Sequence, residues 1–260
     1  MKIRRVETVL LSAKPTMEIR WSGGVLSTVH ASLVQVHTDE GVTGLGETYA
    51  GIFAPHAVRG IVESLEPLLV GEDPTQVSAL FHKMYSKTLF WGRVGAGMSV
   101  IGAIETALWD ILGKVRGLPV YELLGGKAHQ KLPLYASGGL ERPFDELAEE
   151  MREYRRDGFQ AVKVRIGMGP SRDLKKLECV RDALGPDMQL MVDAVQGHNP
   201  EPWSAAQAIQ AGLAMQRFGV RWFEEPCAAT DYSGYAQVRR QTPIPIAGGE
   251  SSTSIHEFRH

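Results

Sequence analysis

The chain has 260 residues, of which 43% are hydrophobic and 22% are charged, and its formal net charge at pH 7 is −2. This composition predicts a soluble globular protein, and the near-neutral charge argues against nucleic acid or a membrane surface as a partner. Two cysteines, Cys179 and Cys227, do not make a disulfide framework, which favours a reducing, cytoplasmic location. The N-terminal segment is interrupted by Thr8 and Ser12 and predicts a strand instead of a signal peptide. No apolar run approaches the length of a membrane span.

Residues 1–127 predict an α+β domain, because three strand patterns are followed by helical patterns. The strands are expected at Ile3–Leu11, Ser27–Thr38 and Thr43–Tyr49, with a hairpin turn at Asp39-Glu40-Gly41. The helices are expected at Pro55–Leu69, Thr75–Tyr85 and Gly97–Arg116. Six apolar residues of the last helix fall on one face, which we expect to be buried. They are Ile101, Ile104, Ala107, Leu108, Ile111 and Leu112.

Residues 128–260 alternate between strand and helix, which places successive strands parallel and side by side. The expected strands are Leu132–Ala136, Ala161–Ile166, Met188–Val192, Val220–Phe223 and Ile244–Ala247. The expected helices are Phe144–Arg156, Arg172–Ala183, Trp203–Phe218 and Tyr232–Gln241. An open doubly wound sheet can be built from such units, but it binds ligands at a single switch point and not at three successive strand ends. A TIM-type (β/α) barrel fits better, because its site lies at the carboxyl ends of all the strands.

Five strand–helix units can be counted in this part of the chain, whereas a TIM-type barrel has eight. We therefore expect an α/β fold with a (β/α) barrel truncated after the fifth strand, its last unit ending within Ser254–His260, preceded by the α+β domain. Five strands cannot close a barrel and would leave unpaired strand edges. We accordingly expect the 260 residues to be part of a longer chain.

Three carboxylates stand just after apolar runs that predict buried strands: Asp193, Glu224 and Glu250. A single such residue is usually a solvated loop residue or a helix N-cap. Three at equivalent ends of neighbouring parallel strands converge, and their mutual repulsion requires a cation. An all-oxygen site of this kind suits a hard divalent ion, with Mg²⁺ as the first choice. The spacing therefore predicts a metal site.

Lys163 and Arg165 alternate with Val162 and Val164 in the strand before the first of these carboxylates, so the two cations share one side of the strand. One interpretation is a structural ion pair with Asp193 or a neighbouring carboxylate. The other is a general base and its electrostatic partner. A lysine beside a second cation has a lowered pKa, which makes its amine a usable base near neutral pH.

Three motifs carry a resemblance to a known family. They are the segments GAIETALWD (residues 102–110), LPVYELLGG (118–126) and GFQAVK (158–163). The sequence contexts of the three carboxylates follow them along the chain, and this joint order is specific. With these motifs the chain resembles the enolase superfamily, specifically its mandelate racemase/muconate-lactonising branch. The resemblance covers the whole length and implies that the first domain is a capping domain.

The resemblance also implies a reaction. Members of this superfamily use Mg²⁺ and a Lys or His base to remove the proton α to a carboxylate, which gives an enediolate. It implies Asp193, Glu224 and Glu250 as the Mg²⁺ ligands, and Lys163 and Arg165 as catalytic residues. The substrate would be a small-molecule carboxylate, and we expect a homo-oligomer. An α-proton of a carboxylate is very weakly acidic, so a metal and nearby cations are needed to stabilise the dianion.

Some positions refine this resemblance or depart from it. Within the EEP motif we assign the metal to Glu224, since strand alternation turns Glu225 away toward an ion pair in the barrel wall. The family's common Lys-x-Lys signature ends in Arg165 here, and arginine is a poor base. Either Lys163 takes the proton, or Arg165 acts as an electrostatic clamp and the base comes from elsewhere. Val195 replaces an Asn that many relatives carry.

Further residues are candidates for binding the substrate. Gln196 or His198 could compensate for the polar contact that is lost at position 195. Two glycine-containing loops of the capping domain carry aromatic residues suited to closing over a site. They are Lys14–Gly24, with Trp21 and the Gly23-Gly24 pair, and Tyr49–His56 after the third strand, with Tyr49 and Phe53. Tyr49 and Phe53 could equally be core residues of the capping domain.

The leading functional hypothesis is an acid-sugar dehydratase, a hydro-lyase that loses a β-hydroxyl as water after the α-proton is removed. The alternatives are a racemase or epimerase of a 2-hydroxy acid or amino-acid derivative, and an inactive truncated homologue. A racemase needs two opposed bases, and the opposing strands are not in this sequence. Cycloisomerisation of the muconate type and racemisation of acylamino acids are less favoured, because such enzymes usually carry the lysine that Arg165 replaces.

Overall fold

A computed structural model describes residues 1–16, 19–21 and 24–260. The described chain forms two compact units. The first comprises Met1–Pro15, Thr28–Gln130 and Ser252–Arg259, and the second comprises Thr16–Ser27, Lys131–Ser251 and His260. The predicted domain limits, 1–127 and 128–260, remain a prediction.

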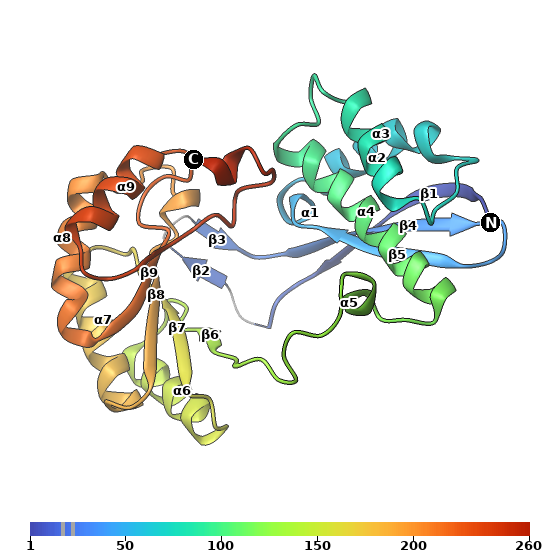
Figure 1. Ribbon diagram of the computed structural model, residues 1–260. Helices are drawn as coiled ribbons and strands as arrows, with labels where there is room; N and C mark the ends of the chain where they lie inside the picture. Colours follow the sequence, from blue (N-terminus) through green and yellow to red (C-terminus); the bar gives the residue numbers. More distant parts are fainter. Residues whose placement is uncertain (17–18, 22–23) are drawn as a thin grey trace. The chain divides into compact units, whose positions relative to one another are not determined.

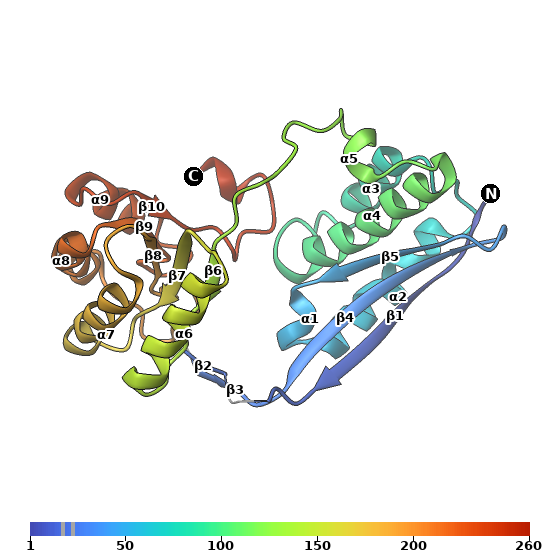
Figure 2. The same cartoon turned by 90° about the horizontal axis from the view of Figure 1, so that it is seen from below.

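The first unit is a three-stranded antiparallel sheet covered by helices (Figure 1). The strand order is β1-β4-β5, and the hairpin predicted at residues 39–41 joins β4 to β5, with the backbone N–H of Thr38 donating to the carbonyl of Val42. Figure 2 shows the strands side by side with the helices along them. The strands are β1 (Ile3–Ala13), β4 (Val29–Thr38) and β5 (Thr43–Thr48). The helices are α1 (Ala50–Phe53), α2 (Pro55–Leu69), α3 (Val77–Lys87), α4 (Gly95–Arg116) and α5 (Val120–Leu123).

Helix α4 forms the centre of this unit's core. Ile101, Ile104, Ala107, Leu108 and Ile111 are fully buried in a core that they share with β1, β4, α2 and α3, as the helical periodicity predicts. Leu112, which was expected on the same buried face, is only half-buried and packs against this core. By length and composition α4 is also the one helix in the described part of the chain that could cross a membrane, contrary to the expectation that no run is long enough. Because its apolar face packs in this core, that length and composition are those of a core helix.

Strand β5 approaches α4 more closely than a side chain permits. A Cβ atom at Gly46 would lie 2.0 Å from the carbonyl oxygen of Ala103, and one at Gly44 would lie 2.0 Å from that of Ala107. The helix backbone itself therefore occupies the space above these two residues. Glycine at 44 and 46 sets the distance between the sheet and its main helix.

The second unit is a parallel sheet with strand order β10-β9-β8-β7-β6, as expected from the strand–helix alternation. Its strands are β6 (Ala136–Gly138), β7 (Ala161–Arg165), β8 (Gln189–Asp193), β9 (Val220–Glu224) and β10 (Ile246–Ala247). Its helices are α6 (Phe144–Arg156), α7 (Pro170–Leu184), α8 (Ala205–Met215) and α9 (Tyr232–Gln241). Short 3-10 turns lie at Gln196–His198 and Gln216–Phe218 in this unit and at Glu257–Arg259 in the first.

One face of this sheet packs against all four helices (Figure 1). Val162 and Val164 of β7, Val192 of β8 and Phe223 of β9 are fully buried in that core, together with residues of α6 to α9. A doubly wound sheet would carry helices on both faces. Helices on a single face correspond to part of a (β/α) barrel, which confirms the predicted fold class.

Three local predictions are wrong. The segment predicted as a loop at Tyr49–His56 contains α1 and the start of α2. Residues 132–135 form no strand, and the first strand of the sheet is β6, because Pro133 cannot donate a backbone hydrogen bond and Leu132 and Leu134 remain 70% and 73% exposed. The segment predicted as a loop at Lys14–Gly24 contains β2 (Ile19–Trp21), which pairs with β3 (Gly24–Leu26) as an antiparallel hairpin. Gly23, which was predicted to make this loop flexible, lies outside the described residues.

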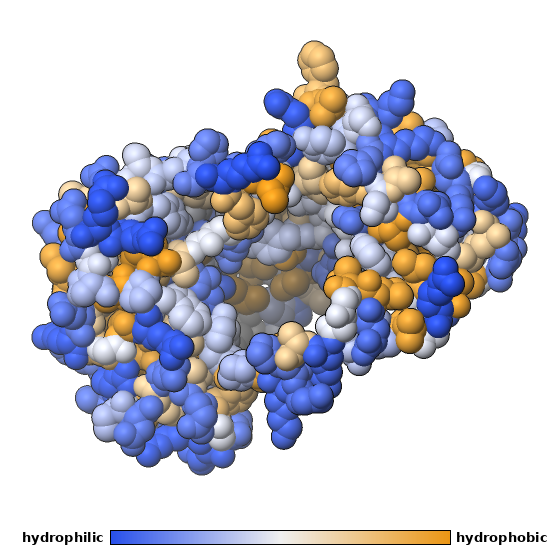
Figure 3. Space-filling model, viewed as in Figure 1, coloured by the Kyte–Doolittle hydropathy of each residue, from blue (hydrophilic) through white to orange (hydrophobic). Residues whose placement is uncertain are grey.

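Figure 3 shows hydrophilic residues over much of the visible face of each unit, with apolar residues exposed between them. Such a mixture is ordinary for a globular surface, because polar atoms are too few to cover it.

We predict that Gly46→Ala destabilises the first unit by about 1–3 kcal/mol, since the new methyl group forces α4 away from β5. The matched control is Gly60→Ala in α2, where a Cβ meets nothing within 4 Å and alanine stabilises a helix by about 0.5–1 kcal/mol. Urea unfolding measures both changes. Equal midpoints for the two variants would contradict the close approach of β5 and α4.

Candidate active and metal-binding site

The parallel register of the second unit brings charged side chains of opposite sign together at the carboxyl ends of β7, β8 and β9. Arg165 pairs in register with Asp193, and Asp193 pairs in register with Glu224. The Nζ atom of Lys163 lies 2.8 and 2.9 Å from the two carboxylate oxygens of Glu224 and 3.6 Å from Oδ2 of Asp193. An Arg165 guanidinium nitrogen lies 3.4 Å from the same Oδ2 atom. Lys163 and Arg165 thus share one side of β7, as alternation predicts.

The protonation of Lys163 differs from the prediction. Burial lowers the pKa of Lys163, but the hydrogen bond to Glu224 and the charges of Asp193 and Glu224 outweigh that effect and raise the pKa above its ordinary value. The predicted lowering of this pKa by Arg165 is therefore wrong for this arrangement, because the two carboxylates that contact the amine dominate its pKa. The ion pairs considered as the structural interpretation are present.

Asp193 is the most enclosed carboxylate of the site. It is fully buried, and its Oδ1 atom accepts a hydrogen bond from the backbone N–H of Val195 at 2.9 Å. Burial raises the pKa of Asp193, whereas the charges of Arg165 and Lys163 lower it and that of Glu224 raises it further. Two like charges in adjacent strand ends are thus held together by the two cations of β7.

Aromatic residues flank the lysine and Glu224. The indole N–H of Trp222 donates to Oε2 of Glu224 at 3.1 Å, and the rings of Trp222 and Tyr135 meet edge to face at a centroid distance of 5.5 Å. The Nζ atom of Lys163 lies 5.9 Å from the centre of the Tyr135 ring, within the range of a cation–π contact. These contacts fix the orientation of the Lys163–Glu224 pair.

Glu225 does not point where strand alternation places it. Its φ of 50° is left-handed, so the backbone leaves the strand geometry at this residue. The side chain is 1% exposed, and neither carboxylate oxygen has a hydrogen-bond partner of ordinary geometry among the described residues. Burial raises the pKa of Glu225 to about 7, and the charges of Glu250, Asp193 and Glu224 act in the same direction, against the backbone amide of Gly249. The predicted ion pair in the barrel wall is therefore wrong.

Glu250 meets a histidine from the loop after β8. The Nε2 atom of His198 lies 2.9 Å from Oε1 of Glu250 and 3.4 Å from the hydroxyl of Ser251. Ligand atoms of His198, Glu225 and Glu250 all lie within 4.8 Å of one another. Within the described ranges this is the one group of three His, Cys, Asp or Glu side chains whose ligand atoms all come this close. Asp193, Glu224 and Glu250 do not meet that spacing together, and their role as metal ligands stays a prediction.

The other predicted binding residues lie in different surroundings. Gln196 is buried, and its amide bonds the carbonyl of Ala194 and the backbone N–H of Trp203, so it organises the loop after β8. Trp21 is half-buried at the end of β2. Tyr49 and Phe53 are 51% and 58% exposed and meet edge to face at 5.8 Å, so they are not core residues of the first unit. Their role as substrate contacts stays a prediction.

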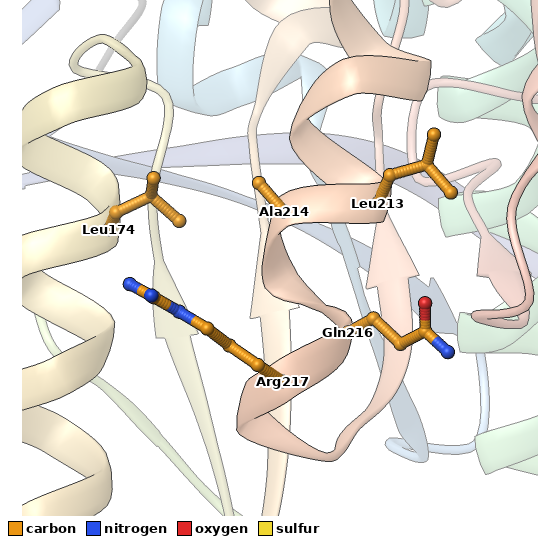
Figure 4. Close-up of a pocket in the computed structure, with 5 residues that line it drawn as sticks. All are labelled: Leu174, Leu213, Ala214, Gln216 and Arg217. Carbon is orange, nitrogen blue, oxygen red and sulfur yellow. The ribbon is translucent and has the colours of Figure 1, made fainter.

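A separate depression lies between α7 and α8 (Figure 4). Leu174, Leu213, Ala214, Gln216 and Arg217 line it, and Arg217 pairs with Glu178 at 2.5 Å. It lies on the helix side of the second unit, and the strand-end carboxylates do not line it.

Comparison with known proteins identifies the family. Residues 5–125 match the family described as mandelate racemase/muconate lactonizing enzyme, N-terminal domain, and residues 146–260 match the one described as enolase C-terminal domain-like. A crystal structure of a racemase from Streptomyces coelicolor with bound magnesium is 31% identical, with a TM-score of 0.89 over 99% of this chain and 71% of that one. The chain belongs to the mandelate racemase/muconate lactonizing enzyme branch of the enolase superfamily.

Two curated relatives in this branch show how much of the family's length is present. D-galactarolactone cycloisomerase of Agrobacterium fabrum is 35% identical over 255 residues, which is 96% of this chain and 65% of that protein. Arabinonate dehydratase of Saccharolobus solfataricus is 34% identical over 230 residues, which is 86% of this chain and 60% of that protein. The chain thus spans less than two thirds of the length of either relative.

We predict that Glu225 makes the stability of the metal-free protein depend on pH. Because its folded-state pKa of about 7 exceeds the ordinary 4.5, the folded protein holds this proton more tightly, and stability falls as the pH rises from about 4.5 to about 7. Glu225→Gln removes this loss, so relative to the parent it gains about 3 kcal/mol between pH 4 and pH 8.

The measurement is urea unfolding in EDTA at both pH values, with Glu201→Gln, an exposed position, as the matched control. Comparing the two pH values cancels any constant cost of burying the glutamine amide. A difference between Glu225→Gln and the parent that is the same at pH 4 and pH 8 would contradict the assignment.

Proposed function

We propose that the protein removes the proton α to the carboxylate of a small sugar acid with the help of Mg²⁺, and that water is then lost by β-elimination. The observation that carries this proposal is the contact of Lys163 and Arg165 with Asp193 and Glu224 at the carboxyl ends of adjacent parallel strands. Acid–base groups and paired carboxylates at this edge are where a barrel enzyme places its chemistry. The likeness to arabinonate dehydratase supports the dehydratase class.

The charge balance of the site fits a divalent cation. The charge of Glu224 raises the pKa of Asp193, and the charges of Glu250, Asp193 and Glu224 raise that of Glu225. Among the described residues, the cations Lys163 and Arg165 lie against this group of four carboxylates. With all six groups ionised the site carries two uncompensated negative charges. We propose Asp193, Glu224 and Glu250 as the groups that hold Mg²⁺, since the ion prefers oxygen ligands. When bound, it supplies stabilisation of the second negative charge that develops on the substrate carboxylate.

The two β7 cations suit different tasks. Arg165 keeps its charge at all relevant pH values and is fitted to attract and orient the substrate carboxylate. Lys163 can accept a proton only after losing its own, which the nearby carboxylates oppose as long as their charges are uncompensated. Lys163 is the candidate base and Arg165 the candidate electrostatic clamp. A base from another element remains the alternative.

Racemisation and cycloisomerisation also begin with removal of the α-proton, and they are the second candidates for the reaction. The racemase named above and D-galactarolactone cycloisomerase are both similar to this chain, so racemisation or cycloisomerisation competes with dehydration. Mass spectrometry separates the classes, because a dehydratase product lacks one water, whereas an isomerase product keeps the substrate mass. A homo-oligomeric state and a cytoplasmic location also stay predictions, and sedimentation velocity tests the first.

We predict that Glu224→Gln and Asp193→Asn each weaken Mg²⁺ binding at least about tenfold and reduce turnover in parallel, because each removes one negative charge without changing the side-chain volume. Isothermal titration calorimetry measures the affinity, and Asp187→Asn at an exposed position is the matched control. Unchanged Mg²⁺ affinity and turnover in both variants would refute the ligand assignment.

We predict that Lys163→Ala slows exchange of the substrate α-proton with solvent deuterium by about 10²–10⁴-fold, the usual contribution of a general base. Arg165→Ala raises KM more than it lowers the exchange rate at saturating substrate, since it removes a clamp. NMR detection of deuterium incorporation isolates this step from elimination. Parental exchange rates in both variants would show that β7 does not carry the base.

A further inference from the structure

We propose that His198, Glu225 and Glu250 form a pocket for a divalent transition-metal ion, distinct from the Asp193–Glu224 end of the site. One ligand atom from each of the three residues lies within 4.8 Å of the other two. All three belong to the second unit and lie in the segments that follow β8, β9 and β10. The pocket shares Glu250 with the proposed Mg²⁺ site and in that respect rests on the proposed function.

The buried carboxylate of Glu225 is the observation that points to a ligand. The side chain is 1% exposed, and neither oxygen has a hydrogen-bond partner of ordinary geometry among the residues that the structure describes, although the backbone amide of Gly249 acts on the carboxylate. Buried polar groups are almost always paired, and a buried charge without a partner is strongly unfavourable. The charges of Glu250, Asp193 and Glu224 repel that of Glu225. A cation beside Glu225 supplies the missing partner.

The backbone holds Glu225 in place for this contact. Its N–H donates to the carbonyl of Ala247 at 3.1 Å, and its carbonyl accepts from the N–H of Gln196 at 3.0 Å, so both neighbouring strand ends fix it. A Cβ atom at Gly197 would lie 2.0 Å from Oε2 of Glu225. Only glycine at position 197 therefore leaves room for the carboxylate next to His198.

The donor set selects the class of ion. An imidazole nitrogen with two carboxylates suits Mn²⁺, Co²⁺ or Zn²⁺, whereas Mg²⁺ and Ca²⁺ favour all-oxygen sites. His198 and Glu250 have side-chain exposures of 25% and 37%, so an ion can enter from solvent, while Glu225 forms the closed end. The Nε2 of His198 already faces Glu250 at 2.9 Å.

Co²⁺ is the probe that tests the pocket, because its visible absorption reports nitrogen and oxygen coordination without any need for turnover. Metal-free protein titrated with Co²⁺ is expected to develop this absorption. Glu225→Gln and His198→Ala are each expected to weaken Co²⁺ binding at least tenfold, and Gly197→Ala is expected to do the same by displacing Glu225. Asp193→Asn is expected to leave the Co²⁺ spectrum unchanged while it weakens Mg²⁺ binding. His129→Ala and Glu201→Gln, both at exposed positions, are the matched controls.

Circular dichroism tests whether each variant is folded. Glu225→Gln removes a buried charge, so we expect this variant to fold and to allow Co²⁺ binding to be measured. The pocket is overturned if Co²⁺ does not bind the parent, or if Glu225→Gln and His198→Ala bind Co²⁺ as the parent does. Loss of Co²⁺ binding in Asp193→Asn alone also overturns it and leaves the proposed Mg²⁺ site standing. Unchanged Mg²⁺ binding in Asp193→Asn, with Co²⁺ binding lost in His198→Ala, instead supports the pocket and contradicts the Mg²⁺ ligands.

Discussion

Repulsion among carboxylates at one edge of a parallel sheet is the constraint on which the site depends. Parallel pairing places Asp193 beside Glu224 in register, the residue after β9 adds Glu225, and the segment after β10 adds Glu250. The Lys163 amine donates to both carboxylate oxygens of Glu224, and Arg165 lies 3.4 Å from Asp193, but Glu225 has no hydrogen-bond partner of ordinary geometry within the described residues. The fold thus concentrates more negative charge than its own cations neutralise, which is the electrostatic condition for binding a divalent ion.

The backbone of the loops after β8 and β9 is strained to keep these groups in place. Val195 has a φ of 52° and Glu225 a φ of 50°, and positive φ is a marked outlier for a β-branched residue such as valine. The loops are tied to one another, because the N–H of Ala194 donates to Glu224 and that of Gln196 donates to Glu225. The buried amide of Gln196 closes the loop from inside. Such local strain persists only when the surrounding contacts over-determine it, and it clusters at functional sites.

The periodic features of the sequence predict the fold well. Predictions fail where the backbone leaves a regular element, and each failure has an identifiable cause. Alternation in β7 correctly places Lys163 and Arg165 on one side, because a regular strand has a fixed period of two. The same rule misplaces Glu225, one residue past the end of β9, where the left-handed φ turns the side chain. The direction of the Lys163 pKa shift also fails, since sequence spacing gives the neighbours but not their distances. One signal for Glu225 in the sequence was Gly197 in the loop after β8. Because this glycine has no side chain, it leaves space for the Glu225 carboxylate.

Lys163 connects the electrostatics of the site to its chemistry. Its amine is a counter-ion of Glu224 and Asp193, and those carboxylates raise its pKa. A divalent ion that neutralises the same carboxylates lowers the pKa of Lys163, because the proton and the ion compete for one set of negative charges. By linkage, protonation of Lys163 weakens binding of the ion by the same free energy. In the proposed reaction, the ion-paired cation and the base are then two protonation states of Lys163. Arg165 cannot take part in this exchange, since its guanidinium stays charged, and it keeps one positive charge beside Asp193 in both states.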